Sequence, residues 1–328
     1  MLSIIISTWN SLSYLRECID SIFALNLDRF EIIVVDSNSK DGTREYLRKM
    51  TGWDTRIRSV TCENRTAWTE ANQIGLDLSR GDWLCLSNPD IIFNRNFREM
   101  MEDCEKNSEI LAVAPQLVWP DGRKQWPAKT ITPELSLWGH TRLGRWVLAK
   151  LGKTPTWQYR YPRTDTPLPV PFPQGSLFMV HRDVFTMLKG HLWNRGYLNG
   201  VSDFDAFLNF ARHGVKIWLY PQVRMIHYGS YISKKSADWI ERDQAYGFVL
   251  YFRYHPWLSN RISPGLYSLL FGLEGVLAVL FDVAGSLIKK NEWFNPAHSA
   301  WRAGQRWLGL VEGWRYRIGL DGTGRSDG

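Results

Sequence analysis

The chain has 328 residues, of which 44% are hydrophobic and 22% are charged. This composition is typical of a globular protein and excludes a collagen repeat, a coiled coil and an intrinsically disordered chain. The formal net charge of +7 indicates an anionic partner, such as a nucleotide, a phospholipid surface or a nucleic acid. The 17 tryptophans are unusual, because this residue type is favoured at membrane boundaries and on sugar faces.

Two features of the sequence indicate an intracellular chain. The four cysteines are scattered without a Cys-x-x-Cys pair, which is typical of reduced thiols and not of a disulfide or zinc framework. The N-terminal residues have no basic segment and too short an apolar run for a signal peptide. We therefore expect a cytoplasmic protein, with any membrane contact peripheral and on the inner face of the cytoplasmic membrane.

The first 115 residues alternate between strand and helix patterns. Residues 3–8 form a continuous apolar run that predicts a buried parallel strand, and apolar residues then recur at helical spacing from 12 to 22. Both patterns repeat, with strands at 31–36, 56–61 and 83–87 and helices at 43–50 and 67–78. This alternation predicts an α/β fold of the Rossmann-like type, with a mostly parallel sheet flanked by helices.

The composition changes between residues 116 and 165. This segment holds nine Lys and Arg residues against three Asp and Glu, together with five tryptophans. We interpret 116–170 as a basic, Trp-rich insertion or acceptor region, although these tryptophans could also simply pack it onto the core. Regular structure resumes at 171–180, followed by a helix at 203–213 and strands at 215–219 and 223–227, within a domain that we extend to residue 235.

Residues 236–328 predict a helical, apolar C-terminal extension. Within it, residues 266–288 are strongly apolar but are interrupted by Glu274 and Asp282, so the charge-free stretch is shorter than the roughly 20 residues of a spanning helix. Residues eight apart lie within about 80° of each other on a helix, so the two acids share one face. The pattern favours an amphipathic helix in the plane of a membrane, with packing on the protein or a spanning helix as alternatives.

Polar residues follow the first two predicted strands. Ser7-Thr8-Trp9-Asn10 comes after the first strand and Asp36 ends the second, at the strand ends where open α/β sheets bind ligands. Neither a Gly-x-Gly-x-x-Gly motif nor a P-loop motif is present, which disfavours a dinucleotide fold and a P-loop enzyme. Asp36 is therefore a candidate to bind a base or ribose, or it braces its turn.

Further candidates carry ionisable side chains. Asp90, in Asn88-Pro89-Asp90, can hold a divalent cation that bridges a diphosphate, or it belongs to a capped turn. Asp203 and Asp205 lie at the start of a predicted helix. One carboxylate can act as a general base, or both acids are there because the helix dipole favours negative charge at a helix N-terminus. His227 follows the last predicted strand, and a lone histidine is more often structural than a ligand.

Taken in order, these motifs resemble the family 2 glycosyltransferases of the GT-A fold. The resemblance covers about residues 1–230, and each motif is weak alone although their order is specific. The Asn-Pro-Asp version is most similar to the rhamnosyltransferase-like branch. The motifs are Ser7-Thr8-Trp9-Asn10, Asp36-Ser37, Glu63-Asn64-Arg65, Glu70-Ala71-Asn72, Asn88-Pro89-Asp90, Gly175-Ser176, Asp203-Phe204-Asp205 and His227-Tyr228-Gly229-Ser230.

The resemblance implies an inverting, metal-dependent transfer of a sugar from a nucleotide diphosphate donor to a hydroxyl of a glycan or lipid-linked oligosaccharide in cell-surface polysaccharide synthesis. It implies that Asp203 is the catalytic base and that Asp90 and His227 hold Mg²⁺ or Mn²⁺. The residues implied on the acceptor side are Gly175, Ser176 and Asp205. Those implied in donor binding are Thr8, Asn10, Asp36, Ser37, Asn64, Asn72 and Asn88.

Two positions depart from the family pattern. Ser37 stands where many members have an acid that reads uracil, which leaves the base open, and Asn209 stands where the branch usually has an arginine. The branch suggests a donor such as dTDP-rhamnose. The alternative function is a catalytically inactive GT-A-like module that binds nucleotide sugars or acts as a scaffold at the membrane. No nucleic-acid-binding motif is present, so we expect no nucleic-acid partner.

Overall fold

The computed structural model describes residues 1–126, 128–129, 150, 165–229, 237–258, 263–288 and 296–316. Most of the predicted insertion, including Trp138, Trp146 and Trp157, lies outside the described residues. The chain divides into two compact units. The first comprises Met1–Lys129, Tyr159–Trp193 and Ala206–Ile232, and the second comprises Thr130–Gln158, Asn194–Asp205 and Ser233–Gly328. The second unit thus combines the residues from Ser233 onward with two earlier segments, one of which carries Asp203 and Asp205.

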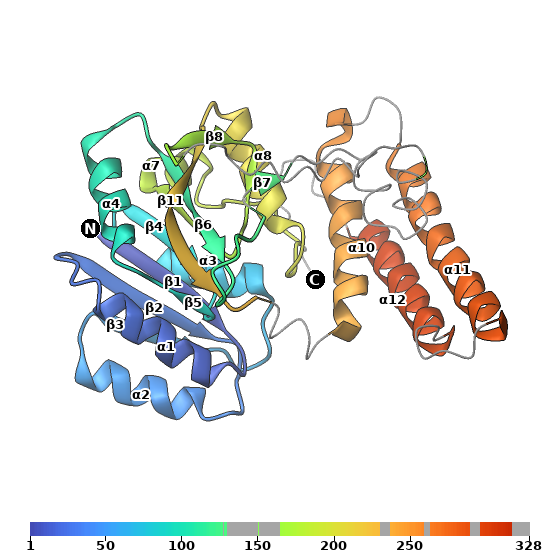
Figure 1. The fold of residues 1–328 in the computed structure, drawn as a ribbon, viewed down its shortest axis with the longest axis horizontal. Helices are drawn as coiled ribbons and strands as arrows, with labels where there is room; N and C mark the ends of the chain where they lie inside the picture. The colour runs from blue at the N-terminus through green and yellow to red at the C-terminus, as the bar shows by residue number, and fades with distance from the viewer. Residues whose placement is uncertain are drawn as a thin grey trace. The chain divides into compact units, whose positions relative to one another are not determined.

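The first unit is built on a nine-stranded sheet in the order β3-β2-β1-β4-β10-β6-β11-β5, with β8 paired to β11 (Figure 1). Strands β1 to β4 are parallel to one another, β10 is antiparallel to β4 and β6, and β11 is parallel to β6. The strands are β1 Leu2–Thr8, β2 Phe30–Asp36, β3 Ile57–Thr61, β4 Trp83–Ser87, β5 Ile91–Ile92, β6 Ala112–Val118, β8 Leu168–Val170, β10 Leu177–His181 and β11 Ile217–His227, with β7 Ala128–Lys129 and β9 Phe172–Pro173 forming a separate pair.

Helices cover both faces of this sheet. Alternate residues of β2 point to opposite faces, so that Ile32 and Val34 join the cluster that contains α1, while Ile33 and Val35 pack with Ala71 of α3. Burial on both sides explains why β1 and β2 are continuous apolar runs. The helices are α1 Leu12–Phe23, α2 Thr43–Trp53, α3 Trp68–Leu78, α4 Asn96–Lys106, α7 Arg182–Met187 and α8 Ser202–Arg212, of which α8 begins in the second unit.

The α/β class is confirmed, but the structure differs from the sequence-based elements in several places. Strand β6 continues to Val118 in the middle of the sheet, so the insertion cannot begin at residue 116. Helix α4 was not among the expected elements. The two short strands expected at 215–219 and 223–227 are one strand, β11, whose register against β6 shifts between Tyr220 and Arg224. The shift comes at Pro221, which cannot donate a ladder hydrogen bond.

The second unit consists mainly of helices α10 Ala237–Tyr254, α11 Pro264–Ile288 and α12 Pro296–Arg315, with the short 3-10 helix η1 Pro256–Leu258. Glycines allow α12 to approach α10 closely, because a Cβ at Gly309 would overlap the carbonyl oxygen of Arg242 and one at Gly313 would lie 2.8 Å from Val249. Arg306 of α12, which is 8% exposed, joins the three helices by pairing with Glu241 of α10 and Glu274 of α11.

One described helix is long and apolar enough to cross a membrane, over the 21 residues Pro264–Ala284 of α11. Its two acids share a face, as the spacing predicts, but that face does not point to solvent. Glu274 pairs with Arg306, and Asp282 accepts a hydrogen bond from Ser299 of α12. The polar face of α11 is therefore directed to α12.

Candidate active site

The sheet brings most of the predicted donor-site residues to one edge. Strands β1, β2 and β4 are parallel, so Thr8, Asp36 and Asn88 all lie at or just after their carboxyl ends. Strand β10 is antiparallel to β4 and therefore begins at that edge, where the backbone N–H of Asn88 donates to the carbonyl oxygen of Ser176 at 2.9 Å. Gly175, beside Ser176, lies at the same edge.

Two asparagines shape the turns after β1 and β2. Asn10 and Asn38 have φ of 48° and 60°, in the left-handed region that asparagine tolerates better than most residues. The Asn10 side-chain oxygen accepts from the backbone N–H of Lys40 at 2.7 Å, and the backbone N–H of Asn10 donates to Ser39 Oγ at 2.8 Å. The two turns therefore hold each other in place at the edge of the sheet.

Two buried polar side chains at this edge have atoms without a partner. Asp36 is fully buried, and its Oδ1 accepts from the Ser39 N–H at 3.1 Å, but its Oδ2 has no hydrogen-bond partner. Asn72 is also fully buried and donates to Ser7 Oγ and Trp68 O, while its Oδ1 has no partner. A buried acceptor without a partner is costly, so hydroxyl or N–H groups of a ligand would suit both positions.

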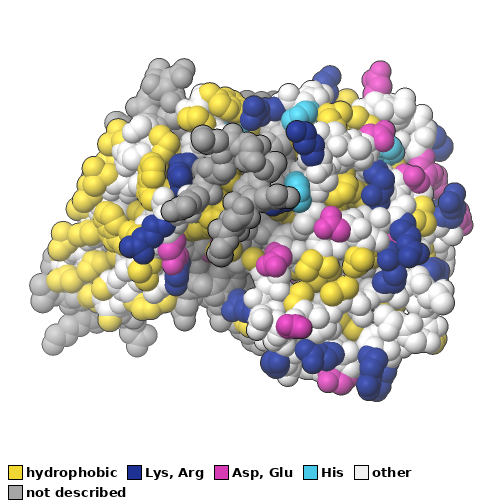
Figure 2. Space-filling model, turned by 180° about the vertical axis from the view of Figure 1, so that it is seen from behind, with side chains coloured by type: hydrophobic (Ala, Val, Ile, Leu, Met, Phe, Trp, Pro, Cys, Tyr) yellow, Lys and Arg dark blue, Asp and Glu magenta, His cyan; other side chains and the backbone are white. Residues whose placement is uncertain are grey.

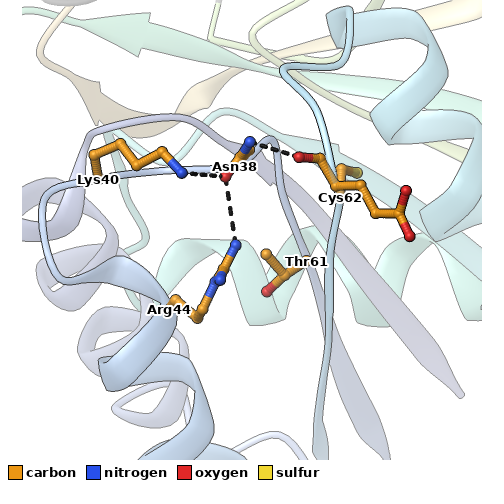
Figure 3. Close-up of a pocket in the computed structure, with 6 residues that line it drawn as sticks. Asn38, Lys40, Arg44, Thr61 and Cys62 are labelled. Atoms are coloured by element: carbon orange, nitrogen blue, oxygen red, sulfur yellow. Dashed lines mark hydrogen bonds between the residues drawn. The ribbon is translucent and has the colours of Figure 1, made fainter.

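An open pocket lies at the carboxyl ends of β2 and β3, between residues 38–44 and residues 61–63 (Figure 3). In it, the side-chain oxygen of Asn38 accepts from Lys40 Nζ at 2.7 Å and from Arg44 Nη2 at 3.4 Å, and its amide nitrogen donates to Glu63 O at 2.6 Å. Two cationic side chains converge here, which suits an anionic or hydrogen-bonding ligand. Asn64, one of the predicted donor residues, is exposed next to this pocket.

Asp90 and His227 form a buried pair, each 6% exposed. Strand β5 directly follows Asp90 and pairs with the end of β11, so His227 lies opposite Ile91. His227 Nε2 is 3.6 Å from Asp90 Oδ1. Burial lowers the pKa of His227 below its usual range, although the Asp90 carboxylate acts in the opposite direction. The imidazole is therefore neutral near pH 7.

Gln125 determines which nitrogen of His227 carries the proton. Its Nε2 donates to the His227 carbonyl oxygen at 2.7 Å, and a carbonyl can only accept, so its Oε1 must be the atom 2.9 Å from His227 Nδ1. That oxygen also only accepts, so Nδ1 carries the hydrogen and the lone pair of Nε2 faces Asp90. Gln116 Nε2 in turn donates a hydrogen bond to the backbone oxygen of Gln125 at 2.8 Å.

These residues fit a divalent cation. A carboxylate oxygen and an imidazole lone pair both accept, so a cation between them would satisfy both groups. A histidine that ligates a metal typically has its other ring nitrogen fixed by a hydrogen bond, as His227 does here. Among the described residues no three His, Cys, Asp or Glu side chains are placed to share an ion. Asp90 and His227 would therefore hold Mg²⁺ or Mn²⁺ together with phosphate oxygens and water.

Asp203 lies in the second unit, just after a strained loop. Val201 has φ of 71°, which is a rare conformation for a β-branched residue. Asp243 of α10 holds the loop by accepting from the backbone N–H groups of Asn199 at 3.3 Å and Gly200 at 2.7 Å. Backbone strain that the surroundings maintain is typical of functional sites.

Helix α10 can support this loop because residue 247 is a glycine. A Cβ at Gly247 would lie 2.8 Å from the carbonyl oxygen of Gly200 and 3.0 Å from Val201. Asp203, at the first turn of α8, accepts from the N–H of Phe204 at 3.0 Å and is half-buried.

Asp205 occupies a different environment from the acceptor-side position expected for it. The side chain is completely buried in the second unit. Its carboxylate accepts from the backbone N–H of Asn194 at 2.6 Å and from the hydroxyl of Tyr197 at 3.1 Å, and lies 2.6 Å from His255 Nε2. These contacts enclose the carboxylate, so it braces the segment before α8 instead of facing an acceptor. Asn209 donates to the Leu192 carbonyl oxygen at 3.4 Å.

Sequence reasoning missed Gln125, Asp243 and the two cations of the pocket, Lys40 and Arg44. Gln125 contacts a residue 102 positions away, and Asp243 contacts one 43 positions away. No local motif marks either residue. Lys40 and Arg44 did carry a signal, because they belong to the turn and helix that follow Asp36.

Comparisons with known proteins identify the family of the chain. The model of the family named glycosyl transferase family 2 matches residues 3–187, which is more than half of the chain. The chain belongs to glycosyl transferase family 2. Enzymes of this family invert the configuration of the sugar that they transfer.

Curated glycosyltransferases match this chain over part of their length only. The glycosyltransferase GlyG of Streptococcus pneumoniae is 26% identical over 113 residues, which are 34% of this chain and 38% of GlyG. The putative teichuronic acid biosynthesis glycosyltransferase TuaG of Bacillus subtilis is 27% identical over 90 residues, which are 27% of this chain and 36% of TuaG. The matches thus span less than half of these relatives.

Solved structures show the GT-A-like fold. A crystal structure of GalNAc-T7 with UDP, GalNAc and Mn²⁺ has a TM-score of 0.54 at 17% identity, covering 76% of this chain and 50% of that one. The mannosyltransferase PcManGT from Pyrobaculum calidifontis, in complex with GDP-Man and Mn²⁺, has a TM-score of 0.51 at 13% identity, covering 95% and 86%.

Proposed function

We propose that this protein transfers a sugar from a nucleoside diphosphate donor to an acceptor hydroxyl with inversion at the anomeric carbon. The proposal depends chiefly on the buried pair of Asp90 and His227, whose ligating atoms face each other at 3.6 Å. The unpaired acceptors of Asp36 and Asn72 at the same sheet edge support a bound nucleoside. A divalent cation at the pair would offset the charge of the departing diphosphate.

Asp203 is the proposed catalytic base. Its carboxylate takes the proton of the acceptor hydroxyl while that oxygen forms a bond to the anomeric carbon. The bond from this carbon to the donor phosphate oxygen breaks on the opposite face, and the nucleoside diphosphate leaves with the electron pair. The support for Asp203 is its Asp-Phe-Asp motif at the start of α8 and the strained loop that Asp243 holds before it.

For the substrates, we propose a deoxysugar donor such as dTDP-rhamnose and a glycan or lipid-linked acceptor of cell-surface polysaccharide. The Asn88-Pro89-Asp90 motif supports the donor, and the similarity to TuaG, named a putative teichuronic acid biosynthesis glycosyltransferase, supports the acceptor class. We also place the protein peripherally at the inner face of the cytoplasmic membrane, where lipid-linked acceptors would be within reach.

The test is a donor screen combined with one substitution. Full-length protein with Mn²⁺ is scanned by thermal shift against UDP-, GDP- and dTDP-sugars, and sugar transfer to water or to added glycans is then measured with the donors that bind. Asp203→Asn is expected to keep donor binding and to lose transfer, because only the proton acceptor changes. Binding of every donor class without transfer by the wild type would instead support an inactive nucleotide-sugar-binding module.

A further inference from the structure

Helix α11 has the reverse of the side-chain distribution that water favours. Its charged residues, Glu274 and Asp282, are only 6% and 3% exposed. Among its described residues, the large side chains that it exposes are Leu or Val, between 39% and 59% exposed, and they recur at the three- and four-residue spacing of one helix face. They are Leu266, Leu269, Leu273, Val276, Leu277, Leu280 and Val283.

Helix α12 extends this apolar surface. The ring of Trp307 lies against Gly272 of α11, and the Trp314 indole N–H donates to Ser268 Oγ at 3.0 Å. Both tryptophans still expose 38% and 45% of their surface, beside the exposed Leu308 and Val311. We call these four residues and the seven of α11 the apolar helix face. Figure 2 shows hydrophobic side chains gathered over the helical unit, at the left of the view.

The charged side chains around the apolar helix face differ in how exposed they are. In the described parts of α11 and α12, the exposed charged side chains are Arg302, which also pairs with Glu241 of α10, and Arg315. The acids of α11, Glu274 and Asp282, are buried, and Glu312 of α12, whose side chain is 38% exposed, pairs with Arg242. An apolar surface with arginines and tryptophans is complementary to an anionic bilayer.

Two observations favour a bilayer over a protein partner. A protein interface of ordinary size carries about ten hydrogen bonds. The exposed side of α11, in contrast, offers no polar side chain among the described residues from Gly265 to Ala284. Tryptophans whose indole N–H is bonded while the ring stays exposed, such as Trp314, are typical of the membrane boundary.

We propose that the apolar helix face docks α11 and α12 in the plane of an anionic lipid bilayer. The helices lie in the interface and do not span, because the other side of α11 packs its acids against α12 along its length. Such a surface would hold a glycosyltransferase beside a lipid-linked acceptor, and only this purpose rests on the proposed function. The docking itself is independent of catalysis.

The test compares charge introduced on and off this surface. The full chain, Leu273→Glu/Leu280→Glu and the control Leu78→Glu/Met187→Glu are sedimented with phosphatidylglycerol-containing vesicles and with pure phosphatidylcholine vesicles. Leu78 and Met187 are matched controls because they are exposed apolar residues of the first unit, 38% and 45% exposed. We expect the α11 variant to lose about tenfold or more of its vesicle partition, and the control variant to bind like the wild type.

Extraction by alkaline carbonate and nucleoside diphosphate release in solution separate the outcomes. Docking predicts extraction of the wild type by alkaline carbonate, and unchanged turnover of a soluble donor by the α11 variant. Absence of turnover in the wild type as well as in both variants would contradict the proposed function and leave the vesicle result valid. Equal vesicle binding by the α11 variant, failure of the wild type to bind, or a dimer that the α11 substitutions dissociate would each overturn the bilayer proposal.

Discussion

The side-chain amide of Gln125 holds both the ring and the backbone of His227. Its oxygen lies 2.9 Å from Nδ1 and its nitrogen donates to the His227 carbonyl at 2.7 Å. This pairing turns the lone pair of Nε2 toward Asp90, so that a carboxylate and an imidazole face each other in a buried place. The metal site that we propose therefore depends on a glutamine that no family motif marks.

Substitution of Gln125 by leucine should weaken Mn²⁺ binding by about 10- to 100-fold, because the tautomer and orientation of His227 are no longer fixed. Mn²⁺ affinity is measured by calorimetry, and the tautomer by nitrogen NMR of the imidazole. The control is Gln73→Leu, since Gln73 contacts His191 Nδ1 at 3.1 Å and Gly190 O at 2.9 Å by the same chemistry elsewhere in the unit. Equal loss in both variants would point to general destabilisation instead.

Alanine at Gly247 should reduce turnover by about 100-fold, because the added Cβ displaces the loop that carries Asp203 and displacements of about 1 Å can cost this much. The Mn²⁺ affinity should stay unchanged, since Asp90 and His227 belong to the first unit. Gly304→Ala is the matched control, with no atom within 4 Å of its Cβ, and should stabilise α12 by about 1 kcal/mol. Normal steady-state turnover of Gly247→Ala would argue against Asp203 as the base.

The stability of the helical unit should depend on the protonation of Asp243. Burial raises its pKa from 3.8 to about 6, although the N–H groups of Asn199 and Gly200 act to lower it. The folded state thus holds this proton more tightly, so the contribution is most favourable below pH 4 and is lost as the pH rises to about 6. The loss amounts to about 3 kcal/mol.

Urea unfolding of the wild type and Asp243→Asn between pH 4 and pH 7 measures this contribution. The difference in the free energy of unfolding between the two proteins should change over this range and become constant above it. A difference that is independent of pH would show that the Asp243 carboxyl titrates alike in the folded and unfolded chains.

Removal of the Arg306 guanidinium should destabilise the second unit strongly. Arg306→Leu leaves Glu241 and Glu274 without their shared buried partner, at an expected cost of about 3–5 kcal/mol. Arg302 also pairs with Glu241, but its side chain is 48% exposed, so Arg302→Leu should cost less than about 1 kcal/mol. Tryptophan fluorescence during urea unfolding reports both values, and equal losses would contradict the role of burial.

The local patterns of the sequence predict the first half of the sheet well and the supports of the site poorly. Strands β1 and β2 are buried on both faces, so continuous apolar runs mark them. Strand β6 contains Pro115 and Gln116, which read as loop residues until the structure shows that Gln116 Nε2 bonds Leu117 O and Gln125 O.

Long-range contacts and buried acids account for most of the other differences. The helical spacing of Glu274 and Asp282 correctly places them on one face of α11, but only the position of Arg306 and Ser299 shows that this face is turned inward. Asp205 follows Asp203 by two residues in a family motif, yet its carboxylate is enclosed by groups up to 50 positions away. Sequence spacing predicts which face of a helix or strand a side chain lies on, but it does not predict which residues contact that side chain.

The most direct test of metal-dependent glycosyl transfer is the rate of nucleoside diphosphate release from a bound donor, measured with and without Mn²⁺ in the wild type and Asp90→Asn. The wild type should release nucleoside diphosphate at least about 100-fold faster with Mn²⁺, because the cation stabilises the charge that develops in the transition state by several kcal/mol. Asp90→Asn should lose this stimulation and still fold, as judged by its circular dichroism. Release at the same rate in both proteins, with or without the cation, would contradict the account.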